Sequence, residues 1–136
     1  MTGIGNGILL CDYDNDRVII EGLVFKKTFE VSLTKLSNFA PYFSNKNLAL
    51  IKLDIEGGEV IAIQDGIEFV NKIHVPFIFS EFNSHYIVKH KLDSKKYLHY
   101  FADNGYKISS KGFFGKYYSS VDDVQPGNLY FTYHGN

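Results

Sequence analysis

Cysteine is nearly absent from this sequence, since Cys11 is the only one. A lone cysteine cannot form a disulfide within the chain, and no spacing of cysteine and histidine resembles a zinc site. The sequence therefore excludes a disulfide-stapled secreted domain and predicts no metal ligands of this kind. One free thiol fits a reducing compartment.

Positive charge suited to phosphate binding is also scarce. Thirteen of the fourteen basic residues are lysine, Arg17 is the only arginine, and the formal net charge is −1. Nucleic-acid binding needs a basic patch, and bidentate phosphate recognition favours arginine, so we expect no nucleic-acid partner. No segment resembles a signal peptide or an apolar run long enough to span a membrane. We therefore expect a soluble, cytoplasmic protein.

The composition that remains is that of one globular domain. The chain has 136 residues, 45% hydrophobic and 21% charged, which is enough for a substantial core. No repeat or low-complexity linker divides it. We expect a single domain over residues 1–136.

The most informative segment is a strand that ends in acidic residues. Residues 48–53 are almost entirely apolar, which is typical of a strand buried on both faces. Asp54 and Glu56 follow directly, and a helix is expected to begin after Gly57. In an open α/β sheet, ligands bind at the carboxyl ends of the strands, so these carboxylates are candidate ligand-facing groups. Acidic residues also favour a helix N-terminus, which is the structural alternative.

The residues around this turn carry a family resemblance. The run Lys52–Glu59, followed by Gln64–Gly66, resembles the FkbM family of S-adenosylmethionine-dependent methyltransferases. The segment Pro76–Glu81 supplies the strand and the glutamate that the family has next, and Tyr97–Tyr106 is similar to its following helix and Gly-Tyr exit. The resemblance covers about residues 28–108. Upstream, Ser37 stands where the family usually has Asp.

The resemblance implies an α/β fold, namely the C-terminal half of a Rossmann-like class I methyltransferase fold. Methyltransferases of this class hold the cofactor at a glycine-rich turn after their first strand, with an acid after the second strand. Gly3, Gly5 and Gly7 imitate such a turn, but only Met1 and Thr2 precede them, and the turn needs a strand before it. We therefore expect a partial FkbM-type domain that lacks the glycine-rich cofactor-binding half, as a fragment or truncated form.

Strands are expected at both ends of the chain and in its middle. Residues 48–53 and 77–82 are short, apolar and separated by one helical segment, which predicts a parallel pair. The resulting sheet should be mixed, with an N-terminal β-hairpin (8–11 and 18–20) and a C-terminal antiparallel pair (106–109 and 129–133).

Helices are expected between these strands. Asp93 or Ser94 should cap a helix that ends at Gly105. Gly66 should end or kink the helix that follows the acidic turn. The other expected helical features are a short helix over 33–43 that stops near Pro41, the residues Val60, Ile61 and Ile63 facing the sheet, and Tyr97, Leu98 and Phe101 recurring at helical spacing.

The family resemblance also gives the candidate site residues their roles. Asp54 and Glu56 would bind S-adenosylmethionine, with Asp54 facing its methionine end or the substrate. Asp54, Glu81 and His85 are the candidate catalytic residues, with Glu81 as the general base on an acceptor hydroxyl or its orienting group. His85 is the better proton acceptor near neutral pH. The family's range suggests O-methylation of a glycan or a small metabolite, and the isolated chain is expected to be inactive and to hold no cofactor.

Three alternatives remain open at this point. Asp54, Glu56 and Glu81 form an oxygen-rich set that could hold Mg²⁺ or Ca²⁺ in a metal-assisted methyltransferase. The chain could instead be a non-catalytic remnant that acts by binding a partner. In the structural alternative, Glu56 and Glu59 stabilise the helix start through its dipole, and Glu81 is a strand-end residue in a solvated loop.

Two surfaces also have alternative readings. The aromatic segment 113–118 is either a substrate lid or a loop packed onto the domain. An apolar strand at 48–53 left at the edge of a sheet invites aggregation, so the N-terminal hairpin or a second chain should cover it.

Overall fold

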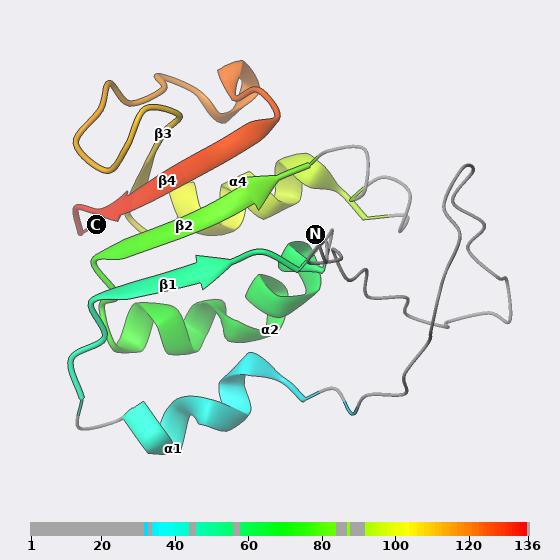
Figure 1. The fold of residues 1–136 in the computed structure, drawn as a ribbon, viewed down its shortest axis with the longest axis vertical. Coiled ribbons are helices and arrows are strands. Elements are labelled where there is room, and N and C mark those ends of the chain that lie inside the picture. Colours follow the sequence, from blue (N-terminus) through cyan, green and yellow to red (C-terminus); the bar gives the residue numbers. More distant parts are fainter. Residues whose placement is uncertain are drawn as a thin grey trace, which may run out of the picture.

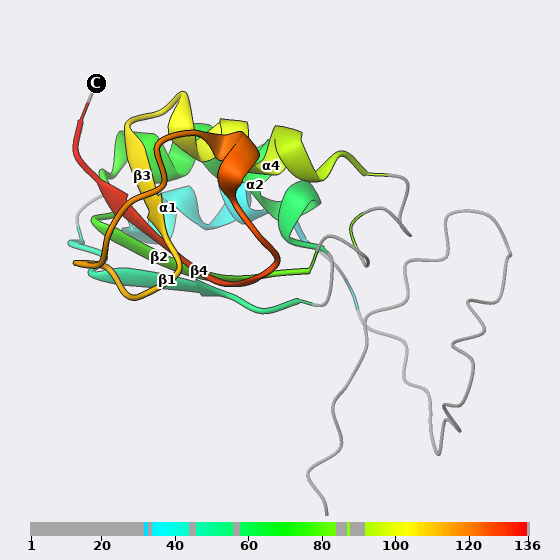
Figure 2. The ribbon, with the colours of Figure 1, turned by 90° about the horizontal axis from the view of Figure 1, so that it is seen from above.

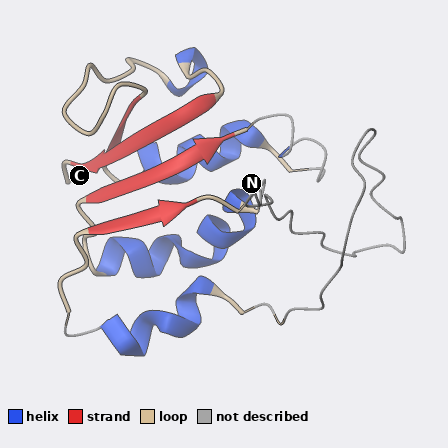
Figure 3. Cartoon of the chain, in the orientation of Figure 1, coloured by secondary structure: helices blue, strands red, loops and turns tan. Residues whose placement is uncertain are grey.

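The structure is a computed structural model that describes residues 32, 34–43, 46–55, 58–83, 87 and 92–135. Its elements follow one another as an α/β chain (Figures 1 and 3). They are η1 (Leu36–Phe39), α1 (Ala40–Phe43), β1 (Leu50–Leu53), α2 (Glu59–Lys72), β2 (Phe77–Phe82), α4 (Ser94–Ala102), β3 (Tyr106–Ser109), η2 (Val121–Asp123) and β4 (Gly127–Tyr133). The expected N-terminal hairpin lies outside the described residues.

The four described strands form one mixed sheet in the order β1-β2-β4-β3. β1 and β2 are parallel and are joined through α2, which confirms the expected strand–helix–strand unit. β4 runs antiparallel to both β2 and β3. The expected C-terminal antiparallel pair is therefore confirmed, and β4 lies between β2 and β3.

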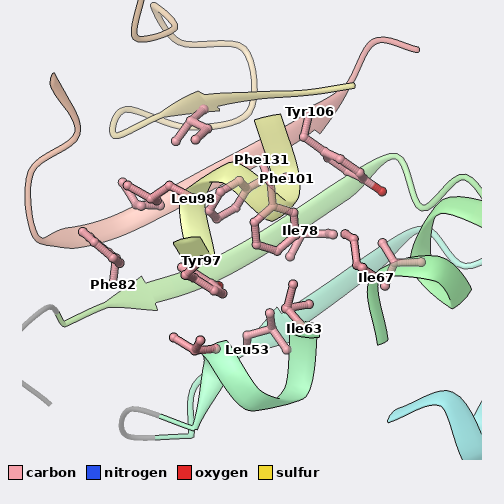
Figure 4. Close-up of a cluster of buried hydrophobic side chains, with 14 of the residues drawn as sticks. Leu53, Ile63, Ile67, Ile78, Phe82, Tyr97, Leu98, Phe101, Tyr106 and Phe131 are labelled. Atoms are coloured by element: carbon pink, nitrogen blue, oxygen red, sulfur yellow. The ribbon is translucent and has the colours of Figure 1, made fainter. Parts of the chain in front are cut away.

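The core lies between one face of this sheet and the helices α2 and α4 (Figure 2). Along β2 every second side chain is buried, and these inward positions are Ile78, Ser80 and Phe82. Figure 4 shows the side chains that fill the space between the layers. They come from α2 (Val60, Ile63, Ile67, Val70), from α4 (Tyr97, Leu98, Phe101) and from β4 (Leu129, Phe131), all of them buried.

The helix α4 begins where the sequence predicts. The side chain of Asp93 accepts hydrogen bonds from the backbone N–H groups of Lys95 (2.9 Å) and Lys96 (3.2 Å), as an N-cap does. At the other end Gly105 has a φ of 83°, the left-handed conformation that glycine adopts without strain.

The helix α2 differs from the expectation, because it runs without interruption through Gly66. Gly66 is buried against Leu36 of η1, and a β-carbon at this position would lie 2.5 Å from Leu36 Cδ2 and 3.0 Å from Leu36 Cβ. The prediction that Gly66 ends the helix is therefore wrong. Because Gly66 has no side chain, η1 can pack closely against α2 at this position.

Three further expectations about burial and helix ends are wrong. Ile61 points away from the sheet and is 42% exposed, since it does not share the inward stripe of Val60 and Ile63. Pro41 lies inside α1 rather than at its end, because the first turn of a helix does not need the N–H group that proline lacks. The strand β1 is not buried on both faces: it is an edge strand of the described sheet, and Leu50 is 49% exposed.

Candidate functional site

The carboxyl ends of β1 and β2 lie side by side, because these strands are parallel neighbours (Figure 1). Leu53, the last residue of β1, pairs with Ser80 of β2. Continuing this register by one residue sets Asp54 beside Glu81, at the roughly 4.8 Å spacing of neighbouring strands. The structure thus brings these two carboxylates to the same edge of the sheet.

Asp54 and Glu81 also lie on the same face. Side chains alternate along a strand, and Ser80 and Leu53 point toward the helices, so Glu81 and Lys52 lie on the other face. Lys52 Nζ forms an ion pair with Asp54 Oδ2 at 2.8 Å, and this ion pair holds the Asp54 carboxylate on the same face. Among the described helices none covers this side of the sheet, which we call the open face (Figure 2).

Both site side chains remain accessible to a ligand. The Asp54 side chain is 39% exposed and that of Lys52 is 61% exposed, and Glu81 is half-buried. The ion pair reduces the repulsion that two neighbouring carboxylates would otherwise have at this edge. The geometry therefore offers an accessible, negatively charged edge that could attract a cation.

The turn after β1 is held by Glu59, the first residue of α2. Its carboxylate Oε1 accepts a hydrogen bond of 2.8 Å from the backbone N–H of Ile55, and the N–H of Gly58 donates to the carbonyl of Ile55 at 3.2 Å. Glu59 is only 2% exposed. It therefore shapes the turn that presents Asp54, and this specific contact goes beyond the helix-dipole role expected from the sequence.

Beneath Glu81, a buried polar pair joins β2 to α4. The hydroxyl of Tyr97 donates to Ser80 Oγ at 2.7 Å, and Ser80 Oγ donates to the carbonyl of Glu81 at 3.3 Å. Burial raises the pKa of the Tyr97 hydroxyl well above its ordinary value, so it stays protonated and remains a donor. Sequence reasoning missed this pair. Its signal is Ser80 itself, a small polar residue at an inward position between Ile78 and Phe82.

The family model described as the methyltransferase FkbM domain matches residues 15–108. The chain belongs to the FkbM methyltransferase family. The match begins thirteen residues before the segment 28–108 that carries the resemblance, and both end at residue 108. No curated protein and no solved structure matches the chain.

Two of the candidate residues of this FkbM domain, Glu56 and His85, lie outside the described residues. Within the described part, histidine, cysteine, aspartate and glutamate side chains form no group of three or more that could hold a metal ion. The alternative metal set of Asp54, Glu56 and Glu81 includes one member outside that part. None of the helices in the described ranges has the length and apolar character that crossing a bilayer requires.

The aromatic loop 113–118, which follows the matched residues, lies away from Asp54 and Glu81. Phe113 packs against Phe77 and Tyr130, with ring centroids 4.9 and 5.2 Å apart, and its carbonyl accepts a hydrogen bond from the Thr132 hydroxyl at 2.8 Å. Phe77 is at the amino end of β2, four residues before Glu81, a distance of about 13 Å along a strand. Phe113 therefore packs onto the domain, as the structural alternative expected, at the end of the strand remote from the carboxylates.

Proposed function

We propose that this FkbM-family chain takes part in the transfer of a methyl group from S-adenosylmethionine to a hydroxyl group of a glycan or small metabolite. The observation that carries the proposal is the parallel register of β1 and β2, which sets Asp54 beside Glu81. In open α/β sheets this carboxyl edge is the ligand-binding edge. Family membership supports the reaction class, and the register supports the choice of Asp54 and Glu81.

The described residues fit the charged end of the cofactor. S-adenosylmethionine, when bound, supplies a methyl group on a positively charged sulfonium. A carboxylate at the strand edge lowers the free energy of a nearby cation, and this contribution grows as water is excluded. We assign this role to Asp54, whose orientation the Lys52 ion pair fixes. Glu56, which lies outside the described residues, is proposed as a second contact to the cofactor.

Glu81 is proposed as the group that handles the acceptor's proton. The Glu81 carboxylate would accept the proton of the acceptor hydroxyl as its oxygen takes the methyl group. Since the methyl donor would lose its positive charge and Glu81 its negative charge, charge would balance across the transfer. The Tyr97–Ser80 pair supports the backbone of Glu81 from below. His85, outside the described residues, is proposed as the alternative proton acceptor.

The described residues do not fit the adenosine end of the cofactor. That end needs a glycine turn that allows close backbone approach, and the described glycines with positive φ are Gly105, Gly112, Gly127 and Gly135. None of these four follows β1 or β2, and Gly58, which does follow β1, has a φ of −76° and caps α2. We therefore propose that the described residues do not include the adenosine-binding half and that the chain alone binds the cofactor weakly.

The accessible edge of β1 favours a second candidate function, in which the chain binds another polypeptide and performs no catalysis. Within the described sheet β1 has a neighbour on one side only, and such an edge strand is a site for strand addition. A second chain at this edge is equally compatible with a methyltransferase completed in trans.

An NMR titration of the isotope-labelled chain with S-adenosylmethionine tests the proposed function, because chemical shifts detect weak binding. We expect changes in the amide signals of Asp54, Ile55 and Glu81 that reach saturation only at millimolar ligand. Asp54→Asn should abolish these changes, whereas the control Asp103→Asn, at the end of α4, should leave them intact. Signal changes confined to other parts of the chain, or none at all, would contradict the assignment. A dissociation constant in the low micromolar range would contradict the missing adenosine-binding half.

A further inference from the structure

A third polar side chain lies at the carboxyl edge of the sheet, beside Glu81. β4 runs antiparallel to β2, so its first residues lie next to the last residues of β2 (Figure 1). Asn128, which follows Gly127 at the start of β4, is the Cα partner of Glu81. The side chains of two directly paired residues lie on the same face, with their β-carbons about 4.5–5.5 Å apart. Asp54, Glu81 and Asn128 therefore form one row on the open face, across β1, β2 and β4.

The backbone does not require an asparagine at position 128. Asparagine is typical of turns, where it tolerates a positive φ, and it is depleted within strands. At the start of β4, however, the positive φ of 137° belongs to Gly127. The Asn128 side chain is exposed, and in the described part of the chain no hydrogen bond joins its amide to another residue. The amide therefore keeps its acceptor oxygen and its donor NH₂ group available to a ligand.

An aromatic ring borders this row on the side of the amino end. Phe79 lies on β2 two residues before Glu81 and on the same face, about 7 Å away along the strand. The ring centroids of Phe79 and Tyr130 are 5.2 Å apart, and both side chains are half-buried. The loop residue Phe113 packs against Tyr130, with ring centroids 5.2 Å apart, and so occupies the space beyond that ring. Between this loop and the carboxyl edge, Phe79 is the apolar surface next to the polar row.

We propose that Asn128 binds and orients the acceptor, and that the acceptor carries two neighbouring hydroxyl groups on a saturated ring, as in a sugar. This inference rests on the proposed function, in which Glu81 accepts the proton of the reacting hydroxyl. Asn128 binds the neighbouring hydroxyl, and the C–H face of the ring packs against Phe79. An amide suits this role because it can donate to a hydroxyl or accept from it, but does not compete with Glu81 for the proton.

This arrangement selects acceptors by the placement of their hydroxyl groups. An acceptor with a single hydroxyl can contact Glu81 or Asn128 but not both. An acceptor whose hydroxyls lie on opposite sides of the ring meets the same restriction, because the two protein side chains are neighbours across the β2–β4 pair. One additional net hydrogen bond corresponds to about a threefold to tenfold gain in affinity.

An NMR titration of the isotope-labelled chain with three probes of the same ring size tests the proposal. The probes are the vicinal trans-cyclohexanediol, the trans-cyclohexanediol with its hydroxyls on opposite ring carbons, and cyclohexanol. We expect the vicinal diol to shift the side-chain NH₂ signals of Asn128 and the amide signals of Phe79 and Glu81. Its dissociation constant should be millimolar, and about threefold to tenfold below those of the other two probes, because it makes one more hydrogen bond.

Three variants assign the preference to particular side chains. Asn128→Ala should remove it, so that the three probes bind about equally, and the fold should remain intact because Asn128 is exposed. Phe79→Leu should weaken all three probes by a similar factor, since it removes the ring contact and not the hydrogen bonds. The matched control is Gln125→Ala, which removes another exposed amide in the loop before β4 and should keep the preference.

Equal affinities of the three probes for the unchanged chain would overturn the proposal, as would a preference that Asn128→Ala retains. A preference lost in Gln125→Ala as well would overturn the assignment to Asn128, because it would reflect a general change at the start of β4. The result is separable from that of the cofactor titration. Cofactor-induced changes at Asp54 without a diol preference would leave the proposed function and remove this acceptor. A diol preference without cofactor-induced changes would support the binding site and contradict methyl transfer.

Discussion

The carboxylate of Glu59 shows how one side chain can set the geometry of a site without belonging to it. Glu59 is 2% exposed and accepts the hydrogen bond of Ile55 N–H, so it fixes the backbone directly after Asp54. A buried carboxylate remains favourable only while it is hydrogen-bonded. The turn that presents Asp54 therefore depends on Glu59.

Replacing Glu59 tests this role at the residue scale. Glu59→Ala should lower the free energy of unfolding by about 1.5–3 kcal/mol, because it removes the charged acceptor of the part-buried hydrogen bond from the Ile55 N–H. A helix-dipole contribution alone would be about 0.3–1 kcal/mol. Glu59→Gln keeps an acceptor oxygen of the same reach and should cost less than Glu59→Ala. Urea unfolding of the three proteins measures the difference, and equal losses in both variants would show that the hydrogen bond is not what matters.

At the scale of single residues, the positions of the charged site residues could be predicted from the sequence, whereas the buried polar pairs could not. Asp54 directly follows one apolar run and Glu81 lies near the end of another. Since the end of a strand can be predicted from such a run, so can the position of both carboxylates. The hydrogen bond between Tyr97 and Ser80 could not be predicted, because it joins α4 to β2, and the packing of these two elements depends on the whole core. The same holds for the Lys52–Asp54 ion pair, since alternation places both residues on one face but does not fix the rotamers.

At the scale of elements, the contact between η1 and α2 explains why Gly66 is compatible with a continuous helix. Gly66→Ala would gain about 1 kcal/mol of helix propensity but would force its methyl group against Leu36, at a cost of about 1–3 kcal/mol. We expect a net loss of stability. In the double variant Leu36→Ala/Gly66→Ala the loss should be smaller than the sum of the two single losses, with a coupling of about 1 kcal/mol measured by chemical denaturation. Additive losses would contradict a direct contact.

A polar contact holds the same two elements together. Asp65 Oδ2 accepts hydrogen bonds from the Ser37 hydroxyl (2.7 Å) and the Ser37 N–H (3.3 Å), and Lys35 Nζ lies 3.1 Å from Oδ1. The family usually has Asp where this chain has Ser37. A carboxylate there would set a second negative charge beside Asp65, whereas the Ser37 hydroxyl donates to it.

This contact predicts a pH dependence. The hydrogen bond from the Ser37 hydroxyl is the largest of the effects that hold the pKa of Asp65 below its usual 3.8. A lowered folded-state pKa gives stability that is present above the unfolded-state pKa and is lost as the pH falls through the folded-state pKa. Ser37→Ala should therefore lower the melting temperature near neutral pH, and the difference from the unchanged protein should shrink below pH 3.8. Ser119→Ala, an exposed serine in the loop before η2, serves as the control, and a difference that stays constant with pH would exclude the Asp65 contact as its cause.

The pattern of elements could be predicted from the sequence wherever one periodicity dominated. The strands β1 and β2 are short apolar runs, and α4 has a capping aspartate and a stripe of Tyr97, Leu98 and Phe101, so each is found by local rules. Gly66 and Pro41 were misread because the same residue types end helices in one context and are tolerated in another. For Gly66 the deciding factor is Leu36, which is distant in sequence and therefore invisible to a local rule.

At the scale of the whole molecule, the sheet order shows what local reasoning cannot supply. The parallel pair and the antiparallel pair were both predicted, but the insertion of β4 between β2 and β3 follows from packing and not from any one segment. The same order leaves β1 at an edge of the described sheet, where Leu50 is exposed and Ile51 is only partly buried, while Leu53 reaches the core. Under the proposed function, the position of β1 at the edge of the described sheet, beside Asp54 and Glu81, is where another polypeptide would complete the site.

That view leads to a prediction for an enzyme in which this chain is paired with a cofactor-binding half. Asp54→Ala should abolish methyl transfer with little loss of stability, because its ion pair with Lys52 is exposed and such pairs contribute about 0–1 kcal/mol. Glu81→Gln should lower turnover by roughly a hundredfold or more while changing cofactor affinity less, because it removes the proton acceptor but not the binding contact.

Measuring turnover, cofactor affinity and melting temperature for both variants, with Glu59→Ala as the structural reference, separates the three roles. The proposal requires a loss of activity without unfolding for Asp54→Ala, a loss of turnover at nearly constant affinity for Glu81→Gln, and a fall in melting temperature for Glu59→Ala. If all three variants lost stability equally and none lost activity specifically, the carboxylates at this edge would be structural. The register of β1 and β2 would then stand as a feature of the fold, and the chemistry would have to be sought elsewhere in the chain.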